Sequence, residues 1–117
     1  MAVSRVFQRE IVEVPYQLPD GNIKPHMALV LSTDKLQQAE DGMFYAVLIS
    51  SKNLNPDFTL QIQNEWLSKP LSKQSYFVTH IVNYYRTDEV IQSFNNFVKA
   101  QYFDAIMNKV ILSIFDI

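Results

Sequence analysis

The sequence predicts one mainly β domain that ends in α-helix. Short apolar runs separated by turn residues fill the chain up to about residue 87, and neither proline nor glycine occurs after that point. The 117 residues are 48% apolar, which is enough for a core without disulfides, and no repeat or linker divides them. We therefore expect a single domain over residues 1–117, with β structure first and helix last.

Five strands are predicted in the first part of the chain. The first spans residues 8–14 and precedes a turn-rich stretch, residues 15–25, that contains the sequence PDGN. The second and third, MALVL at residues 27–31 and FYAVLI at residues 44–49, are apolar almost without interruption. Such runs are typical of strands buried on both faces, so they are the expected centre of the sheet.

The fourth predicted strand, FTLQIQ at residues 58–63, alternates strictly between apolar and polar residues. We expect Phe58, Leu60 and Ile62 to face the core, because successive side chains of a strand point to opposite faces. The fifth, SYFVTHIV at residues 75–82, is rich in the β-branched and aromatic residues that favour strands.

Two helices are predicted after residue 87. Thr87, Asp88 and Glu89 resemble a helix start, since a capping hydroxyl precedes two carboxylates that suit the positive end of the helix dipole. The later apolar residues recur every four positions, so on one straight helix the stripe would drift by about 40° per step. We therefore place a break near residues 95–99 and a second helix over residues 101–115. This helix is expected to bury Phe103, Ile106, Met107, Val110, Ile111, Ile114 and Phe115 against the sheet, a partner-binding face being the alternative.

Several function classes are excluded or disfavoured. The chain has no cysteine, two glycines and two histidines without metal-ligand spacing, so we expect no disulfide, no phosphate-binding glycine loop, no metal site and no cofactor. No serine lies in a GxSxG motif. The net charge of −2 excludes nucleic-acid binding by bulk charge. No apolar stretch is long enough to span a membrane and no signal peptide is recognisable, so we expect a cytoplasmic protein.

Polar residues collect at the ends of the two central strands. Lys24 and His26 precede one strand, and Ser50, Ser51 and Lys52 follow the next. If these strands pair antiparallel, the two groups become neighbours. A lysine, an imidazole and a hydroxyl together suit a phosphodiester, because they supply charge, proton transfer and a hydrogen bond. The alternative is that these residues serve as turn and capping residues.

The pattern of short segments resembles the MazF/PemK family, the ribosome-independent endoribonuclease toxins of bacterial toxin–antitoxin systems. The family opens with a GDIV-like strand, a PF-like pair, a loop with D-G and K-R-P, and an A-L-V-L-S strand. A later strand ends in I-T/S-S, and an S-Y-V segment follows. The matching segments, within about residues 9–115, are EIVEVPY at 10–16, DG at 20–21, KPHMALVLS at 24–32, LISS at 48–51 and LSKQSYFV at 71–78.

The resemblance implies an SH3-like β-barrel with one or two helices after the last long strand, in a divergent member of the family. It implies a homodimer that takes single-stranded RNA and is blocked by an antitoxin protein. The implied reaction needs no metal or cofactor: the RNA 2′-hydroxyl attacks its own phosphate and leaves a cyclic phosphate.

The family's site residues are only partly present. Ser50 falls at the phosphate-contacting Thr/Ser position and Ser51 at the serine that follows. His26 replaces the catalytic arginine and Arg9 replaces the first-strand glycine. Histidine lacks the bidentate fork of arginine, but it can act as a general acid or base near neutral pH. Our predicted catalytic residues are His26, Ser50 and Ser51.

The predicted substrate-binding residues surround this group. Lys24, Lys52 and Lys73, together with Lys69, fall in loops that would form a local basic rim, the alternative being ordinary solvated surface. His80 is a further candidate, although its apolar neighbours on the same strand face also suit a structural histidine. The alternative for the whole chain is a non-catalytic SH3-like barrel that binds protein or nucleic acid, which the missing arginine favours.

Overall fold

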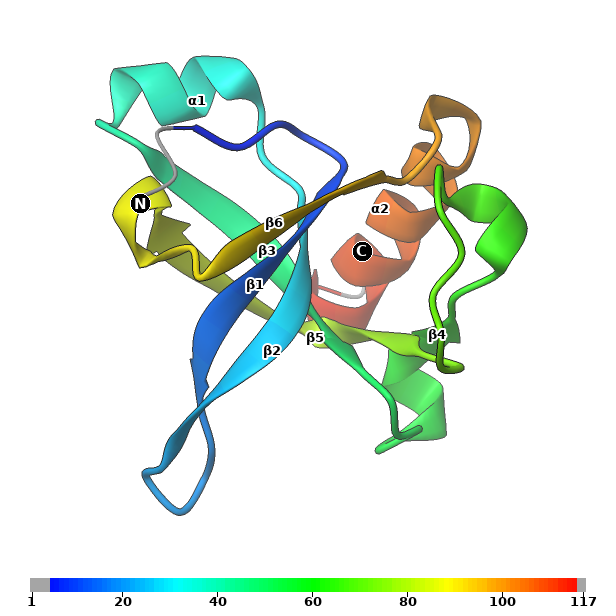
Figure 1. The fold of residues 1–117 in the computed structure, drawn as a ribbon. Helices are drawn as coiled ribbons and strands as arrows, with labels where there is room; N and C mark the ends of the chain where they lie inside the picture. Colours follow the sequence, from blue (N-terminus) through cyan, green and yellow to red (C-terminus); the bar gives the residue numbers. More distant parts are fainter. Residues whose placement is uncertain (1–4, 116–117) are drawn as a thin grey trace.

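A computed structural model describes residues 5–115 and shows six antiparallel strands and a long C-terminal helix (Figure 1). In chain order the elements are β1 (Glu10–Gln17), β2 (Ile23–Val30), α1 (Asp34–Ala39), β3 (Met43–Ser50), β4 (Thr59–Gln61), β5 (Tyr76–Arg86), β6 (Gln92–Phe97) and α2 (Ala100–Phe115). Three short 3₁₀ turns, η1 (Pro56–Phe58), η2 (Asn64–Trp66) and η3 (Thr87–Glu89), lie between them. The fold class is therefore the one predicted, mainly β with a helix at the end.

The strands form one curled sheet in the order β4-β5-β3-β2-β1-β6. The predicted apolar runs of β2 and β3 lie in its centre, where Ala28 pairs with Leu48 and Val30 with Ala46. The two edges approach each other at an isolated antiparallel bridge between Leu67 and Val98, just after η2 and β6. The sheet thus has the form of an SH3-like barrel, although its six strands do not close into a continuous ring of ladders in the described residues.

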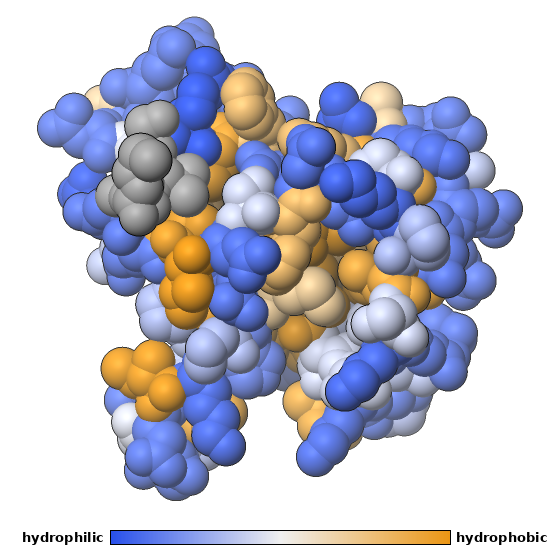
Figure 2. All heavy atoms as spheres, in the orientation of Figure 1, coloured by the Kyte–Doolittle hydropathy of each residue, from blue (hydrophilic) through white to orange (hydrophobic). Residues whose placement is uncertain are grey.

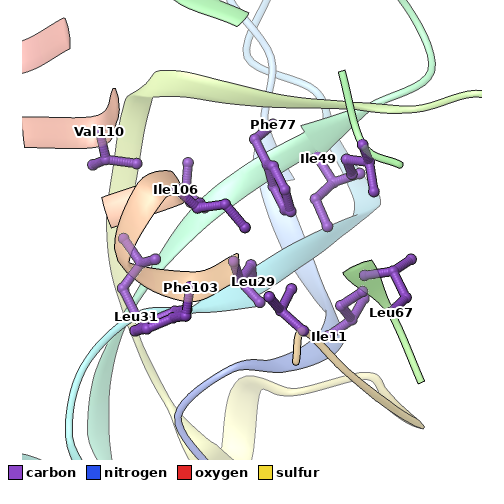
Figure 3. Close-up of a cluster of buried hydrophobic side chains, with 12 residues drawn as sticks. Ile11, Leu29, Leu31, Ile49, Leu67, Phe77, Phe103, Ile106 and Val110 are labelled. Carbon is purple, nitrogen blue, oxygen red and sulfur yellow. The ribbon is translucent and has the colours of Figure 1, made fainter. Parts of the chain in front are cut away.

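Both faces of the sheet are buried. One face packs on α2 through a cluster that includes Ile11, Leu29 and Phe77, as Figure 3 shows. The other face carries a second cluster that includes Val12 and Phe44. Because strand side chains alternate, neighbouring residues such as Ile11 and Val12 supply different clusters. This explains why the central strands are apolar almost throughout.

The prediction that a helix begins at Thr87 is wrong. Thr87–Glu89 forms only the 3₁₀ turn η3, in which the carboxylate of Glu89 accepts a hydrogen bond from the main-chain N–H of Arg86. The chain then becomes β6, which pairs with the free edge of β1. This edge offers unpaired main-chain groups, so tertiary pairing overrides the local helical pattern. The helix predicted over residues 101–115 is confirmed, with α2 starting at Ala100, but the segment before it is the strand β6 and not a helix that breaks near residues 95–99.

Several other elements also differ from the prediction. β1 and β2 extend into the predicted loop over residues 15–25, to Gln17 and from Ile23, and β5 continues to Arg86. The helix α1 was not predicted; Thr33 caps it by accepting a hydrogen bond from Leu36. The strand predicted over residues 58–63 is shorter, because Phe58 belongs to η1 and β4 ends at Gln61. Ile62 is buried as expected.

The burial predicted for the last helix is half right. Phe103, Ile106 and Val110 are buried and Met107 packs beside them. Ile111, Ile114 and Phe115 are exposed instead, and Leu112 is exposed with them. Ile111, Leu112 and Phe115 lie on other sides of α2 than the buried residues, because each residue of an α-helix is rotated by about 100° from the one before. Within residues 5–115 the structure contains no helix with the length and apolar character needed to cross a bilayer.

Candidate functional site

A cavity of about 770 Å³ lies at the end of the sheet where β2 begins and β3 ends. It opens on the face shown in Figure 2, in the hollow between the β1–β2 hairpin and the segments after β3 and η2. Its apolar lining comes from β1, β2, β3, the loop after η2 and β6: Ile11, Met27, Ile49, Leu71 and Phe94. A cavity of this size accommodates a nucleotide-sized ligand.

The strand register brings the two predicted groups of polar residues together. Ala28 pairs with Leu48, so His26 and Ser50 lie two residues beyond this pair on neighbouring antiparallel strands. His26, Ser50 and Ser51 all line the cavity. The convergence expected from the sequence is therefore present in the structure.

The imidazole of His26 is held from two sides. Its ring is half-buried and meets the ring of Tyr16 edge-on, with 5.2 Å between centroids. Its Nδ1 atom lies 3.4 Å from the main-chain oxygen of Lys24. A carbonyl oxygen only accepts hydrogen bonds, so this contact suits the tautomer with the proton on Nδ1, in which Nε2 is an acceptor.

The hydroxyl of Ser50 is oriented by the turn that follows β3. Its Oγ atom accepts a hydrogen bond of 3.1 Å from the main-chain N–H of Lys52. This contact uses a lone pair of the oxygen and leaves the hydroxyl proton free to donate. Ser51 is exposed beside it at the cavity edge.

The rim of the cavity is cationic. Lys52, Lys69 and Lys73 line it together with one carboxylate, that of Glu13. The local balance is thus positive although the whole chain has a net charge of −2. Such a rim attracts anions without a basic footprint on the whole molecule.

Two of the predicted binding residues do not line this cavity. Lys24 lies opposite Tyr16 in the β1–β2 ladder and contributes its carbonyl to the contact with His26. His80 lies on β5, where its exposed ring packs on Phe58 at 5.0 Å between centroids.

Asn96 lines the cavity and was not predicted. It is buried, with 4% of its surface exposed, and its side chain bonds to the segment that carries Lys69. The sequence around it, QSFNNF, lacks the alternation of a strand and covers the end of a predicted helix and the predicted break, so no signal in the sequence singles Asn96 out.

None of the cavity-lining residues in the described chain is an arginine, and all three arginines are engaged elsewhere. Arg5 forms an ion pair with Asp34, and Arg86 donates to carbonyl oxygens at the end of α1. Arg9 donates from Nη1 to the carbonyl of Val98 at 2.9 Å. No second arginine thus compensates for His26 at the arginine position of the resemblance.

The backbone at Arg9 has φ = 78°, in the left-handed region that favours glycine. This is the position at which the family pattern has glycine. The main-chain N–H of Arg9 donates to Val30, and its carbonyl accepts from Val98. Arg9 thus adopts, without being glycine, a backbone conformation that glycine reaches more readily.

A metal-binding cluster is not found in the structure over residues 5–115, where no three His, Cys, Asp or Glu side chains gather. In sequence, no protein-family profile and no curated protein matches the chain. Solved structures do match.

Three of these structures show what the chain is similar to. The MazF toxin of Deinococcus radiodurans superposes with a TM-score of 0.68 at 14% identity, over 92% of this chain and 94% of that chain. The Mycobacterium tuberculosis toxin MazF-mt6 gives 0.68 at 13% identity, over 93% and 98%. The chain has the MazF fold. An endoribonuclease in complex with its cognate antitoxin from a mycobacterial species gives a TM-score of 0.65 at 13% identity, over 92% and 93%. The MazF resemblance seen in the sequence is thereby confirmed for the fold, over nearly the whole chain.

Proposed function

We propose that this protein is a metal-independent endoribonuclease that cleaves single-stranded RNA, as a toxin of a bacterial toxin–antitoxin pair in the cytoplasm. The observation that carries the proposal is the convergence of His26, Ser50 and Ser51 with three lysines on one open cavity. The MazF fold supports it, because the neighbours that share this fold include toxins and an endoribonuclease.

In the proposed reaction His26 acts as general base. Its Nε2 removes the proton of an RNA 2′-hydroxyl, whose oxygen attacks the adjacent phosphorus. The bond between phosphorus and the 5′ oxygen breaks, so the products are a 2′,3′-cyclic phosphate and a 5′-hydroxyl. The leaving oxygen takes its proton from water in the open cavity.

The other residues stabilise the charge that develops on the phosphate. Ser50 donates its free hydroxyl proton to a non-bridging oxygen, and Ser51 lies beside it as a second donor. The ammonium groups of Lys52, Lys69 and Lys73 offset the negative charge of the strand along the rim. Lys24 supports the reaction through its carbonyl contact with His26.

Incubation of the purified protein with single-stranded RNA in EDTA tests this proposal. Cleavage that yields cyclic phosphate ends, and that is lost in His26→Ala, supports it. An inert wild-type protein overturns it. The matched control is Gln38→Ala, an exposed position on α1 that does not line the cavity, which keeps wild-type cleavage.

We further propose that the protein forms a homodimer and binds an antitoxin. The exposed apolar end of α2, with Ile111, Leu112, Ile114 and Phe115, is a surface that a second copy would cover. Sedimentation of the wild type and of a Leu112→Glu variant tests the dimer: the wild type sediments as a dimer and the variant as a monomer. Inhibition of cleavage by the product of a short acidic reading frame next to the gene tests the antitoxin.

A second candidate function is a non-catalytic module that binds nucleic acid or protein through the same cavity. It is favoured by one observation, the lack of an arginine among the described residues of the cavity. Binding of single-stranded RNA without cleavage, in both the wild type and His26→Ala, would select this function over the nuclease.

A further inference from the structure

We propose that Asn96 is a positioning residue of the candidate site: its buried amide fixes the main chain at Lys69 and so holds this lysine at the cavity rim. The inference rests on the proposed function, which supplies an RNA phosphate for Lys69 to bind. It extends that function to a residue of β6 that does not itself need to touch the substrate.

The side chain of Asn96 bonds to two adjacent residues, Ser68 and Lys69. Its Oδ1 accepts from the main-chain N–H of Lys69 at 2.9 Å and from the hydroxyl of Ser68 at 3.1 Å. Its Nδ2 donates to the carbonyl oxygen of Lys69 at 2.9 Å. Both main-chain polar groups of Lys69 are therefore bound by a single side chain, as a strand partner would bind them.

A bulge in β6 places the amide there. Ile11 pairs with Asn96 but the next residue, Val12, pairs with Ser93, so Phe94 and Asn95 have no partner on β1. Asn95 has φ = 50°, a left-handed conformation that asparagine adopts more readily than most residues. Bulges of this kind re-aim side chains beside functional sites. Here Phe94 lines the cavity with Asn96.

The segment before Lys69 is held by main-chain bonds. Ser68 donates to the carbonyl of Phe97, and Lys99 donates to the carbonyl of Trp66. After Lys69 comes Pro70, which has no N–H to offer. The side-chain amide of Asn96 thus holds the next residue as well, because it binds the main chain of Lys69. Aspartate would lack the donor for the Lys69 carbonyl, and leucine would lack every bond while keeping the shape.

The experiment measures binding of a single-stranded RNA with 2′-O-methyl groups, which 2′-hydroxyl attack cannot cleave, as a function of salt. One lost phosphate contact lowers the slope of log K against log salt by about 0.7, or about fivefold in affinity at 0.1 M salt. We expect this change in Asn96→Leu and in Lys69→Ala. The double variant binds no more weakly than Lys69→Ala alone, because the amide acts through the lysine.

The matched control is Asn95→Gly, which keeps the left-handed backbone and the wild-type salt slope. A wild-type slope in Asn96→Leu, or additive losses in the double variant, would overturn the proposal. A merely destabilised protein would lose affinity equally at all salt concentrations, which also counts against it. Should Asn96→Leu not fold, Asn96→Ser replaces it, because a serine hydroxyl is too short for the bonds to Lys69.

Hydrogen exchange gives a second measurement that needs no RNA. The amide of Lys69 is expected to exchange slowly in the wild type and Asn95→Gly, and faster in Asn96→Leu. If the wild type neither binds nor cleaves RNA, the proposed function fails. The exchange measurement by itself still tests whether Asn96 anchors the main chain of Lys69. Equal exchange in all three proteins would overturn that anchoring.

Discussion

The two walls of the cavity hold their functional side chains in different ways. The wall with His26 and Ser50 belongs to β2 and β3, whose positions are set by main-chain ladders and by apolar residues on both faces. The wall with Lys69 is a loop held by main-chain bonds as far as Ser68 and, beyond it, by side chains such as that of Asn96. A ladder depends little on any one polar side chain, whereas the loop beyond Ser68 depends on individual side chains. The proposed catalytic residues His26 and Ser50 thus lie on the wall that ladders hold, and Lys69, a proposed RNA-binding residue, lies on the wall that side chains hold.

The largest effect expected from this comparison is on cleavage. His26→Ala removes the proposed base from the strand wall and is expected to lower kcat by about 10² to 10⁴, the usual contribution of general acid–base groups. The loop wall supplies only charge, so Lys73→Ala is expected to raise KM and leave kcat nearly unchanged. Steady-state kinetics on one RNA substrate measures both. Equal losses of kcat in the two variants would contradict the proposal that the strand wall supplies proton transfer and the loop wall supplies only charge.

A second difference is expected in stability. Leu29→Ala empties space behind the strand wall, where Leu29 is fully buried, and is expected to cost about 2–5 kcal/mol of unfolding free energy. Ser68→Ala removes the hydroxyl that Asn96 and Phe97 share on the loop wall, at a cost of about 1 kcal/mol. Urea unfolding measures both values. A larger loss for Ser68→Ala than for Leu29→Ala would reverse the comparison.

Arg9 links two strands of the sheet, since its main chain bonds to Val30 at the end of β2 and to Val98 after β6. Its left-handed backbone tolerates glycine but strains a β-branched residue. Arg9→Val is therefore expected to cost about 2 kcal/mol, and Arg9→Gly less than about 1 kcal/mol. Thermal or urea unfolding of the pair checks the ranking. Equal losses would show that the guanidinium bond to Val98, and not the backbone, stabilises this position.

The smallest effect concerns Tyr85, in the cluster on the face of the sheet away from α2. Burial raises the pKa of its hydroxyl above 10, with smaller contributions from Tyr16 and Glu89 and an opposing hydrogen bond from Asn83. Above pH 10 the unfolded chain therefore ionises first, so the free energy of unfolding falls as pH rises. Tyr85→Phe lacks this contribution and is expected to lose less stability between pH 9 and pH 11. An identical loss in both proteins, measured by urea unfolding, would contradict the raised pKa.

Much of the strand wall was predictable. The apolar runs of β2 and β3 indicate central strands from composition alone, and antiparallel neighbours place the start of one beside the end of the other. His26, Ser50 and Lys52 therefore follow from local pattern and one assumption about pairing. The predictions for Lys24 and His80 were less precise, because the direction in which a side chain leaves the sheet depends on twist and bulges. His80 lies within β5, at the register shift where Val47 and Leu48 of β3 pair with Val82 and Val78.

The sequence by itself determined the β-then-α order, the buried central strands, the C-terminal helix and the residues that meet at the cavity mouth. Tertiary structure alone decided that residues 92–97 form a strand, that Asn96 binds the main chain of Lys69, and that the end of α2 stays exposed. The physical reason is the range of the interactions. Apolar periodicity depends on residues close together in the sequence. β6 forms because it supplies hydrogen-bond partners to the edge of β1, some eighty positions away.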